Sequence, residues 1–182
     1  MGKMSIKTVV AVGIGAALFF VLGRFVAIPS GIPNTNISLQ YAVLGLFAVL
    51  YGPIAGGLIG LIGHTLIDLS WGGSPWWSWV AASALVGVIV GLLTKRIQLS
   101  EGVFGKKGAV TYVLATLAAM IVCWIGVAPV LDVIIYAEPA NKVFAQGTMA
   151  CIANFLTAAI VGGLLLLAYS KTIAKSGSLK KD

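Results

Sequence analysis

Long apolar stretches, separated by short polar or glycine-rich segments, dominate this chain of 182 residues. A helix of about 20 apolar residues is long enough to cross the hydrocarbon core of a bilayer. With 59% hydrophobic and only 9% charged residues, the chain has the composition of an integral membrane protein. We therefore predict a single all-α membrane domain over residues 1–182. The expected helices cover residues 6–28, 38–51, 53–69, 76–95, 108–131 and 147–171.

The basic residues decide the number of helices, because cytoplasmic loops of membrane proteins carry an excess of lysine and arginine. The second and third helices are short and meet at Gly52 and Pro53, where glycine permits a tight turn and proline can begin a helix. Six membrane-spanning helices with both termini in the cytoplasm separate the charges more cleanly than five. The basic residues then on the cytoplasmic side are Lys3, Lys7, Lys95, Arg96, Lys106, Lys107, Lys171, Lys175, Lys180 and Lys181.

The same topology gathers the unusual polar residues at the outer end. The third outer loop contains the sequence EPANKVFAQG, preceded by Asp132. Near the second loop, His64 and Asp68 are four residues apart on one helix, so their side chains share a face. Ionisable groups are costly in lipid, which favours a face turned towards an internal cavity. There the two side chains either bind a ligand, or only hydrogen-bond each other or cap the helix end.

Tryptophans 71, 76, 77 and 79 follow closely on this pair. Indole rings collect at membrane interfaces without any ligand, but their faces also stack on flat heterocycles and their N–H groups can orient them. Glu138 and Lys142 are more simply explained as a local ion pair. Asn154 either faces the same cavity or joins two helices. The predicted substrate-binding residues are Asn34, Asn36, Gln40, His64, Asp68, Trp76, Trp77, Trp79, Asn141 and Gln146.

The first helix carries two pairs of small residues, each spaced by one turn: Ala11 with Gly15, and Gly13 with Ala17. Small residues at this spacing let another helix approach the backbone closely. The pairs serve either internal packing or docking of a partner protein. If the helix docks a partner, these four residues are the candidate partner-docking set.

Motifs for common catalytic chemistry are missing from the sequence. It has no phosphate-binding G-x-x-x-x-G-K-[ST] loop, no G-x-S-x-G turn, no H-E-x-x-H helix and no C-x-x-C pair. Any energy from ATP must come from another subunit, and we expect no metal and no cofactor in this chain. The basic residues lie between apolar runs, which argues against nucleic-acid binding.

Five sequence blocks together resemble a known family: VGIGAALFFVLGRF, IPNTNI, GPIAGGLIGLIGHTLIDL, WWSWV and EPANKVFAQG. They are similar to the substrate-binding S components of energy-coupling factor (ECF) vitamin transporters, in the subfamily assigned to hydroxymethylpyrimidine or pyridoxine-like compounds. The resemblance implies a multi-pass protein of the bacterial cytoplasmic membrane that binds a vitamin or its precursor at the outer end. It also implies docking, through helix one, to a transmembrane coupling protein (T component) with two ATP-binding cassette ATPases.

Two other functions remain open from the residues alone. The chain could be a free-standing carrier driven by an ion gradient, with Asp68 or His64 exchanging a proton. It could also be a membrane enzyme in which His64 and Asp68 act as base and orienting acid. The absence of a recognised nucleophile or metal set argues against the enzyme. Because the phosphate-binding loop is also missing, we expect ATP hydrolysis only on separate subunits.

Overall fold

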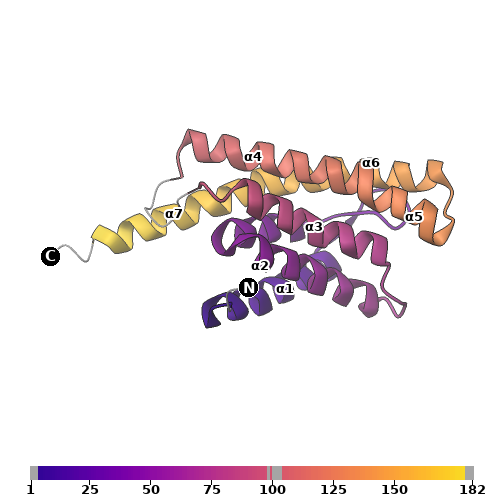
Figure 1. Ribbon diagram of the computed structural model, residues 1–182, viewed down its shortest axis with the longest axis horizontal. Coiled ribbons are helices and arrows are strands. Elements are labelled where there is room, and N and C mark those ends of the chain that lie inside the picture. Colours follow the sequence, from indigo (N-terminus) through magenta and orange to yellow (C-terminus); the bar gives the residue numbers. More distant parts are fainter. Residues whose placement is uncertain (1–3, 98, 100–103, 179–182) are drawn as a thin grey trace.

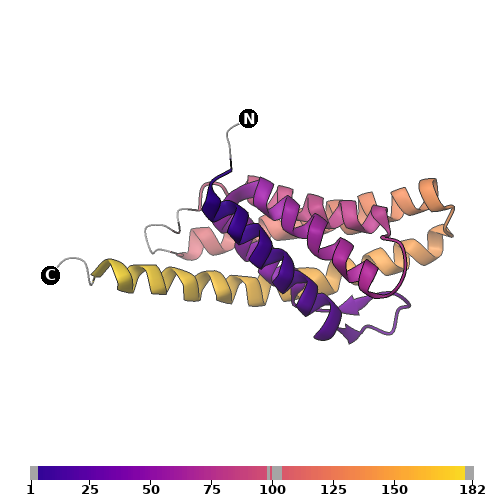
Figure 2. The ribbon, with the colours of Figure 1, turned by 90° about the horizontal axis from the view of Figure 1, so that it is seen from below.

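A computed structural model describes residues 4–97, 99 and 104–178, and it is almost wholly helical. Within these residues, the only strands are a two-residue antiparallel pair, β1 (Ile28–Pro29) and β2 (Asn36–Ile37). Figures 1 and 2 show the helices gathered into one bundle, with the end of α7 projecting beyond it. The predicted all-α class is therefore confirmed.

The helices differ in length and continuity. The last two long ones each pass through a π-helical stretch, η2 or η3, without a break. Among the described residues, four continuous helices are long and apolar enough to cross a membrane, and α3 is shorter. In chain order the segments are α1 (Ile6–Phe25), α2 (Gln40–Ser70), α3 (Trp77–Leu93), α4 (Lys106–Met120), η2 (Ile121–Val127), α5 (Ala128–Tyr136), α6 (Ala140–Thr157), η3 (Ala158–Gly162) and α7 (Gly163–Ser178).

Helix α2 folds back on itself at Gly52. This residue has φ 85° and ψ −177°, which is not a helical conformation and which glycine adopts at no steric cost. A Cβ atom added to Gly56 would lie 2.8 Å from the Cβ of Ala48. In a continuous helix, residues eight positions apart would be separated by about 12 Å. The arms on either side of Gly52 and Pro53 therefore run antiparallel, as the sequence predicts for this junction.

Glycines let the second arm of α2 pack directly on the backbone of α3. A Cβ on Gly56 would lie 2.6 Å from the carbonyl oxygen of Gly87, and a Cβ on Gly60 would lie 2.7 Å from the carbonyl carbon of Ser83. Side chains at these positions would force the helices apart. The close approach matters for the site because His64, one turn beyond Gly60, is thereby brought against Ser83.

We expect Gly60→Ala to destabilise the protein. Overpacking costs about 1–3 kcal/mol, whereas alanine in place of glycine in a helix gains at most about 1 kcal/mol. The added methyl group should therefore lower the melting temperature by several degrees, as measured by thermal unfolding in detergent. Gly126→Ala is the matched control, because nothing lies within 4 Å of its Cβ position. Equal melting temperatures for the two variants would contradict this packing.

The helix boundaries differ from the prediction at the third outer connection. We expected helices to end at 131 and to begin again at 147, but α5 continues to Tyr136 and α6 already begins at Ala140. The apolar runs end earlier than the helices because polar residues continue the helices past the apolar core. Ala137, with φ 53°, ends α5, and Pro139 precedes α6. Similarly, α1 ends at Phe25 rather than 28 because Ile28 enters strand β1.

Three connections meet at one end of the bundle, which we call the cavity end. They are the β1–β2 segment between α1 and α2, the turn between α2 and α3, and the turn between α5 and α6 (Figure 1). The opposite end, called the basic end, holds the start of α4 and the projecting end of α7. Lys3, Lys180 and Lys181, which the charge argument also uses, lie outside the described residues.

Candidate functional site

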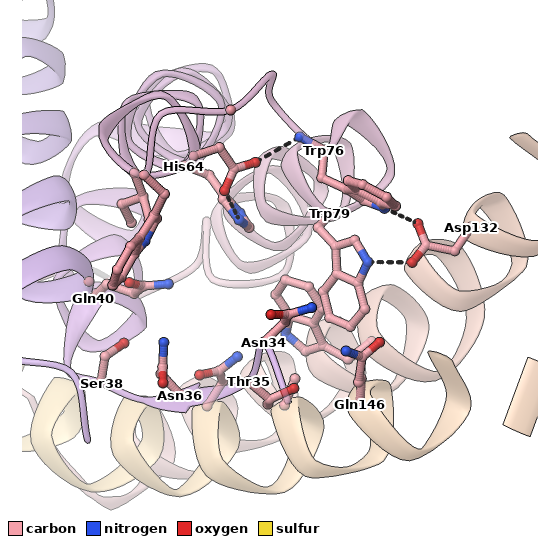
Figure 3. A pocket seen from close by; sticks show the side chains of 18 of the residues that line it. Asn34, Thr35, Asn36, Ser38, Gln40, His64, Trp76, Trp79, Asp132 and Gln146 are labelled. Atoms are coloured by element: carbon pink, nitrogen blue, oxygen red, sulfur yellow. Dashed lines mark hydrogen bonds and ion pairs between the residues drawn. The ribbon is translucent and has the colours of Figure 1, made fainter. Parts of the chain in front are cut away.

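The cavity end contains a cavity of about 630 Å³. Its walls come from every part of the bundle that reaches this end, and they combine aromatic, amide and ionisable side chains (Figure 3). A volume of this order is typical of small-molecule sites. The lining residues are Gly23, Asn34, Thr35, Asn36, Ser38, Gln40, Tyr41, His64, Ile67, Asp68, Trp71, Gly73, Ser74, Trp76, Trp79, Trp124, Asp132, Glu138, Lys142, Gln146, Ala150 and Asn154.

The β1–β2 segment forms one wall and is held in a fixed shape. Ser30 Oγ donates to the carbonyl oxygen of Thr35 at 2.7 Å, and Asn34 adopts a left-handed conformation with φ 58°. The Nε2 of Gln146, on α6, donates to the carbonyl oxygen of Pro33 at 2.8 Å. This bond ties the segment to a helix more than 100 residues away in the chain. The amides of Asn34 and Asn36 are thereby presented to the cavity (Figure 3).

His64 lies between a buried serine and an acid. Its Nδ1 is 2.5 Å from Ser83 Oγ, and its Nε2 is 3.6 Å from Asp68 Oδ1. The hydroxyl of Tyr41, from the first arm of α2, lies 2.7 Å from the same Ser83 Oγ. Both arms of α2 are therefore bonded to α3 at one point. Ser83 is fully buried and does not line the cavity, so this row of acid, imidazole and hydroxyl does not expose a nucleophile to a solute.

Asp132 is a hydrogen-bonding hub in the cavity wall that α5 and the start of α3 form. Its side chain on α5 is buried, and it accepts hydrogen bonds from Trp76 Nε1 at 2.8 Å and Trp79 Nε1 at 2.7 Å (Figure 3). The hydroxyl of Ser78 donates a third. All three donors come from the start of α3 or the residue before it. A buried carboxylate needs such partners, and this one receives them from groups that also set the position of two indole rings.

The turn between α2 and α3 is fixed from both sides. The backbone N–H of Trp76 donates to Asp68 Oδ2 at 2.8 Å. The Trp76 ring lies 4.5 Å from the ring of Tyr136, centroid to centroid. On the outside, the guanidinium of Arg24 lies 3.7 Å from the centroid of the Trp71 ring, a cation–π distance. Trp71 and Trp76 are therefore held by specific contacts.

A series of ring contacts links Trp79 to aromatic residues in the core of the bundle. The Trp79 ring stacks on Trp124 with centroids 5.4 Å apart and planes inclined by 27°. Trp124 in turn meets Tyr41 edge to face at 5.5 Å. Because the indole N–H groups of Trp76 and Trp79 already donate to Asp132, only the ring faces and edges remain for a solute. Of the two ways in which the sequence suggests that an indole can bind a heterocycle, stacking is therefore the one left open to Trp76 and Trp79.

Most of the predicted substrate-binding residues meet at the cavity. Trp77 and Asn141 do not line it: Trp77 is exposed with only its backbone N–H bonded to Tyr136, at 3.2 Å, and Asn141 is exposed in the first turn of α6. The predicted ion pair forms, with Lys142 Nζ 2.6 Å from Glu138 Oε2. The predicted residues that line the cavity are Asn34, Asn36, Gln40, His64, Asp68, Trp76, Trp79 and Gln146.

Sequence reasoning did not include Tyr41, Trp124 and Asp132 among the binding residues. Tyr41 and Trp124 stand in apolar helices, where an aromatic residue is most often part of the core. Asp132 was noticed only as a polar residue at the outer end. An acid within an apolar run is a signal that could have identified it, because a buried carboxylate requires several donors nearby.

The two small-residue pairs of α1 face different surroundings. Ala11 and Gly15 are buried, and a Cβ on Gly15 would lie 3.2 Å from a ring carbon of Phe47. Gly13 and Ala17 are exposed, and nothing lies within 4 Å of the Cβ position of Gly13. The first pair therefore packs α1 against α2, and the second lies on an open helix surface.

Fold and cavity together define a class of protein: a helical membrane protein with a solute-sized chamber at one end of its bundle. The family described as "ECF-type riboflavin transporter, S component" matches residues 3–171. The chain belongs to this family and is a substrate-binding subunit of an ECF-type transporter. The predicted membership of the S components is confirmed, and the hydroxymethylpyrimidine or pyridoxine subfamily stays a prediction.

The chain is also similar to other chains and to one solved structure. A UPF0397 protein of Exiguobacterium sp. is 51% identical over the whole of both chains. A UPF0397 protein of Streptococcus gordonii is 54% identical over 98% of this chain and 95% of that one. The solved structure of ThiT from Listeria monocytogenes superposes with a TM-score of 0.69 at 17% identity, covering 92% of this chain and 97% of ThiT. At that identity, the likeness shows the fold alone.

Proposed function

We propose that this subunit gives an ATP-driven importer its specificity for a small, flat and uncharged heterocycle, which it binds in the cavity at the extracytoplasmic end. Hydroxymethylpyrimidine and pyridoxine-like compounds are the leading substrates. One observation carries the proposal: the carboxylates of the cavity have partners within the protein, whereas several neutral amides have none among the residues that the structure describes.

The pairing of the cavity's charges argues for an uncharged solute. Asp132 accepts three hydrogen bonds, Asp68 accepts one from a backbone N–H and lies beside His64, and Glu138 is paired with Lys142. An anionic solute would be desolvated beside these carboxylates with Lys142 already paired, and a cationic solute would have to compete with the donors that already bind them. Both costs are avoided by a neutral molecule.

The open amides favour a ring with both donors and acceptors on its edge. Within the described residues, the side chains of Asn34, Asn36 and Asn154 have no hydrogen-bond partner, yet all three line the cavity. Each amide offers an acceptor oxygen and two N–H donors. Trp79, whose ring stacks on the nearly buried Trp124, adds an aromatic surface to the same cavity. Rings such as pyrimidines and pyridines satisfy both requirements at once.

The family's own description names riboflavin, which is also a flat heterocycle, so it competes with the two smaller compounds. The discriminating experiment is mass spectrometry of whatever small molecule co-purifies with the protein, followed by titration with hydroxymethylpyrimidine, pyridoxine and riboflavin. Tryptophan fluorescence is a suitable signal because Trp79 and Trp124 line the cavity. We expect a neutral heterocycle to co-purify. A phosphorylated or carboxylate ligand bound more tightly than its neutral analogue would contradict the proposal.

The proposed orientation places six spans in the membrane with both termini in the cytoplasm. The two arms of α2 are then separate spans, because Gly52 reverses the chain between them. The described basic residues Lys95, Arg96, Lys106, Lys107 and Lys171 gather at ends of helices remote from the cavity, which supports a cytoplasmic basic end. The bacterial cytoplasmic membrane is the proposed location.

The proposed partners are a T component and two ATP-binding cassette ATPases. The open pair Gly13 and Ala17 supports α1 as the docking helix, since small residues allow close approach of a second helix. A free-standing carrier using Asp68 or His64 is disfavoured by membership of the S-component family. Liposomes holding the purified subunit without ATPases provide the test: accumulation driven by a proton gradient would support the carrier instead.

A further inference from the structure

We propose that a second, apolar groove between α4 and α7 binds an acyl chain of an anionic phospholipid whose headgroup contacts Lys106. The groove has a volume of about 350 Å³. It lies towards the basic end, so its assignment to the cytoplasmic leaflet rests on the proposed orientation. Its lining residues are Phe104, Gly105, Lys106, Ala109, Tyr112, Val113, Ala159, Ile160, Gly163, Leu164 and Leu167.

The groove exists because two helices with complementary small residues do not close on each other. Gly105, which precedes α4, and Ala109 are four residues apart, and so are Ala159 in η3 and Gly163, the first residue of α7. Such pairs usually bring helices into close contact. Here the buried Tyr112 stands between the helices. Its hydroxyl donates to the carbonyl oxygen of Ala158 at 2.9 Å, and nothing lies within 4 Å of the Cβ position of Gly163.

The shape and polarity of the groove favour an acyl chain. Lys106 and Tyr112 are the polar residues of the lining, and the hydroxyl of Tyr112 is already bonded. The other lining residues offer no polar side chain. Because apolar cavities stay dry, water is not the main occupant. A single hydrocarbon chain is thin enough to lie in the groove, and the surrounding bilayer supplies it.

Charge at the mouth of the groove selects the headgroup. Lys106 is the one charged lining residue, and it is exposed. Lys107 follows it, and Lys171 lies one turn beyond the lining residue Leu167 on α7; both are exposed. Within residues 104–178, the acids Asp132 and Glu138 lie at the other end, in the cavity. Basic pockets between transmembrane helices on the cytoplasmic side are suited to anionic lipid headgroups.

The test uses native mass spectrometry of the full chain from micelles holding equal amounts of phosphatidylglycerol and phosphatidylcholine with identical acyl chains. We expect the wild-type protein to retain phosphatidylglycerol in excess. Gly163→Leu should fill the groove and reduce retention of both lipids several-fold. Lys106→Gln should leave phosphatidylcholine retention unchanged and lower the preference for phosphatidylglycerol by about fivefold, the contribution of one lysine near an anionic surface.

Two matched variants separate the groove from general effects. Gly126→Leu places the same side chain at another open helical glycine, and Lys7→Gln removes an exposed charge from α1. Both should retain lipid like the wild type. Unchanged retention in Gly163→Leu, or an unchanged lipid preference in Lys106→Gln, would overturn the proposal. If Gly163→Leu does not fold, the lipid preference of Lys106→Gln decides alone.

Solute binding measured on the same samples keeps the two proposals apart. The groove and the cavity share no lining residue. A wild-type protein that binds its solute but retains no anionic lipid refutes only the lipid site. A protein that retains lipid at Lys106 but binds no neutral heterocycle refutes only the proposed substrate.

Discussion

Replacing Asp132 with asparagine is expected to weaken solute binding by at least about tenfold and to destabilise the protein. The carboxylate accepts hydrogen bonds from Trp76, Ser78 and Trp79 while almost fully buried, at 2% exposure. An amide keeps one acceptor oxygen and turns an N–H group towards the remaining donors. A buried donor left without a partner costs about 1–3 kcal/mol of stability. Affinity falls because the indoles no longer hold the wall that the solute contacts, and about 1.4 kcal/mol of lost contact corresponds to a factor of ten. Both indoles would lose the group that positions them.

Titration of tryptophan fluorescence with the co-purified solute measures the affinity, and thermal unfolding of the same sample measures the stability. Glu138→Gln is the matched control for the loss of stability, because it also removes a carboxylate at the cavity end. Its partner Lys142 is exposed, and such pairs contribute only about 0–1 kcal/mol. An Asp132→Asn protein with wild-type affinity and melting temperature would show that the hydrogen-bonded hub does not position the indole wall.

Gly13→Leu is expected to abolish assembly with the T component and the ATPases while leaving solute binding intact. The position is open, so leucine fits the isolated subunit, but it would hold a docking helix away from the backbone of α1. Co-purification of the co-expressed T component and ATPases measures assembly. Solute titration of the isolated subunit shows whether the cavity is preserved.

Gly126→Leu serves as the control for an added leucine on an open helical surface elsewhere. Gly15→Leu would not discriminate, because its side chain would meet Ile59 and Phe47 inside the bundle and disturb folding directly. Wild-type recovery of the ATPases with Gly13→Leu would exclude this face of α1 as the docking surface.

The sequence was sufficient for the parts of the fold that depend on composition and on special backbone residues. Apolar run lengths placed the long helices, and Gly52 followed by Pro53 marked the reversal inside α2. Run lengths failed at the connection between α5 and α6. There the helices continue through polar residues, including Lys142, because they line a cavity or face solvent and not lipid.

The sequence did not show which side of each helix faces the interior of the bundle. Trp77 and Trp79 are two residues apart, which turns their side chains by about 200° around the helix. In a helix that is apolar on all sides, nothing in the pattern shows which of them faces inward. The same holds for Gly15 and Gly13 on α1, of which one is packed and the other open. Only tertiary packing fixes these choices.

The central claim is that the cavity opens to the outside and receives a neutral solute, and side-specific cysteine labelling tests it most directly. Asn36→Cys introduces an exposed thiol in the cavity lining, whereas Cys123 and Cys151 are buried. In intact cells, a membrane-impermeant maleimide should label this cysteine, and the co-purified solute should protect it. Lys106→Cys should react only after permeabilisation. Labelling of Lys106→Cys from outside, or labelling of Asn36→Cys that the solute does not change, would contradict the account.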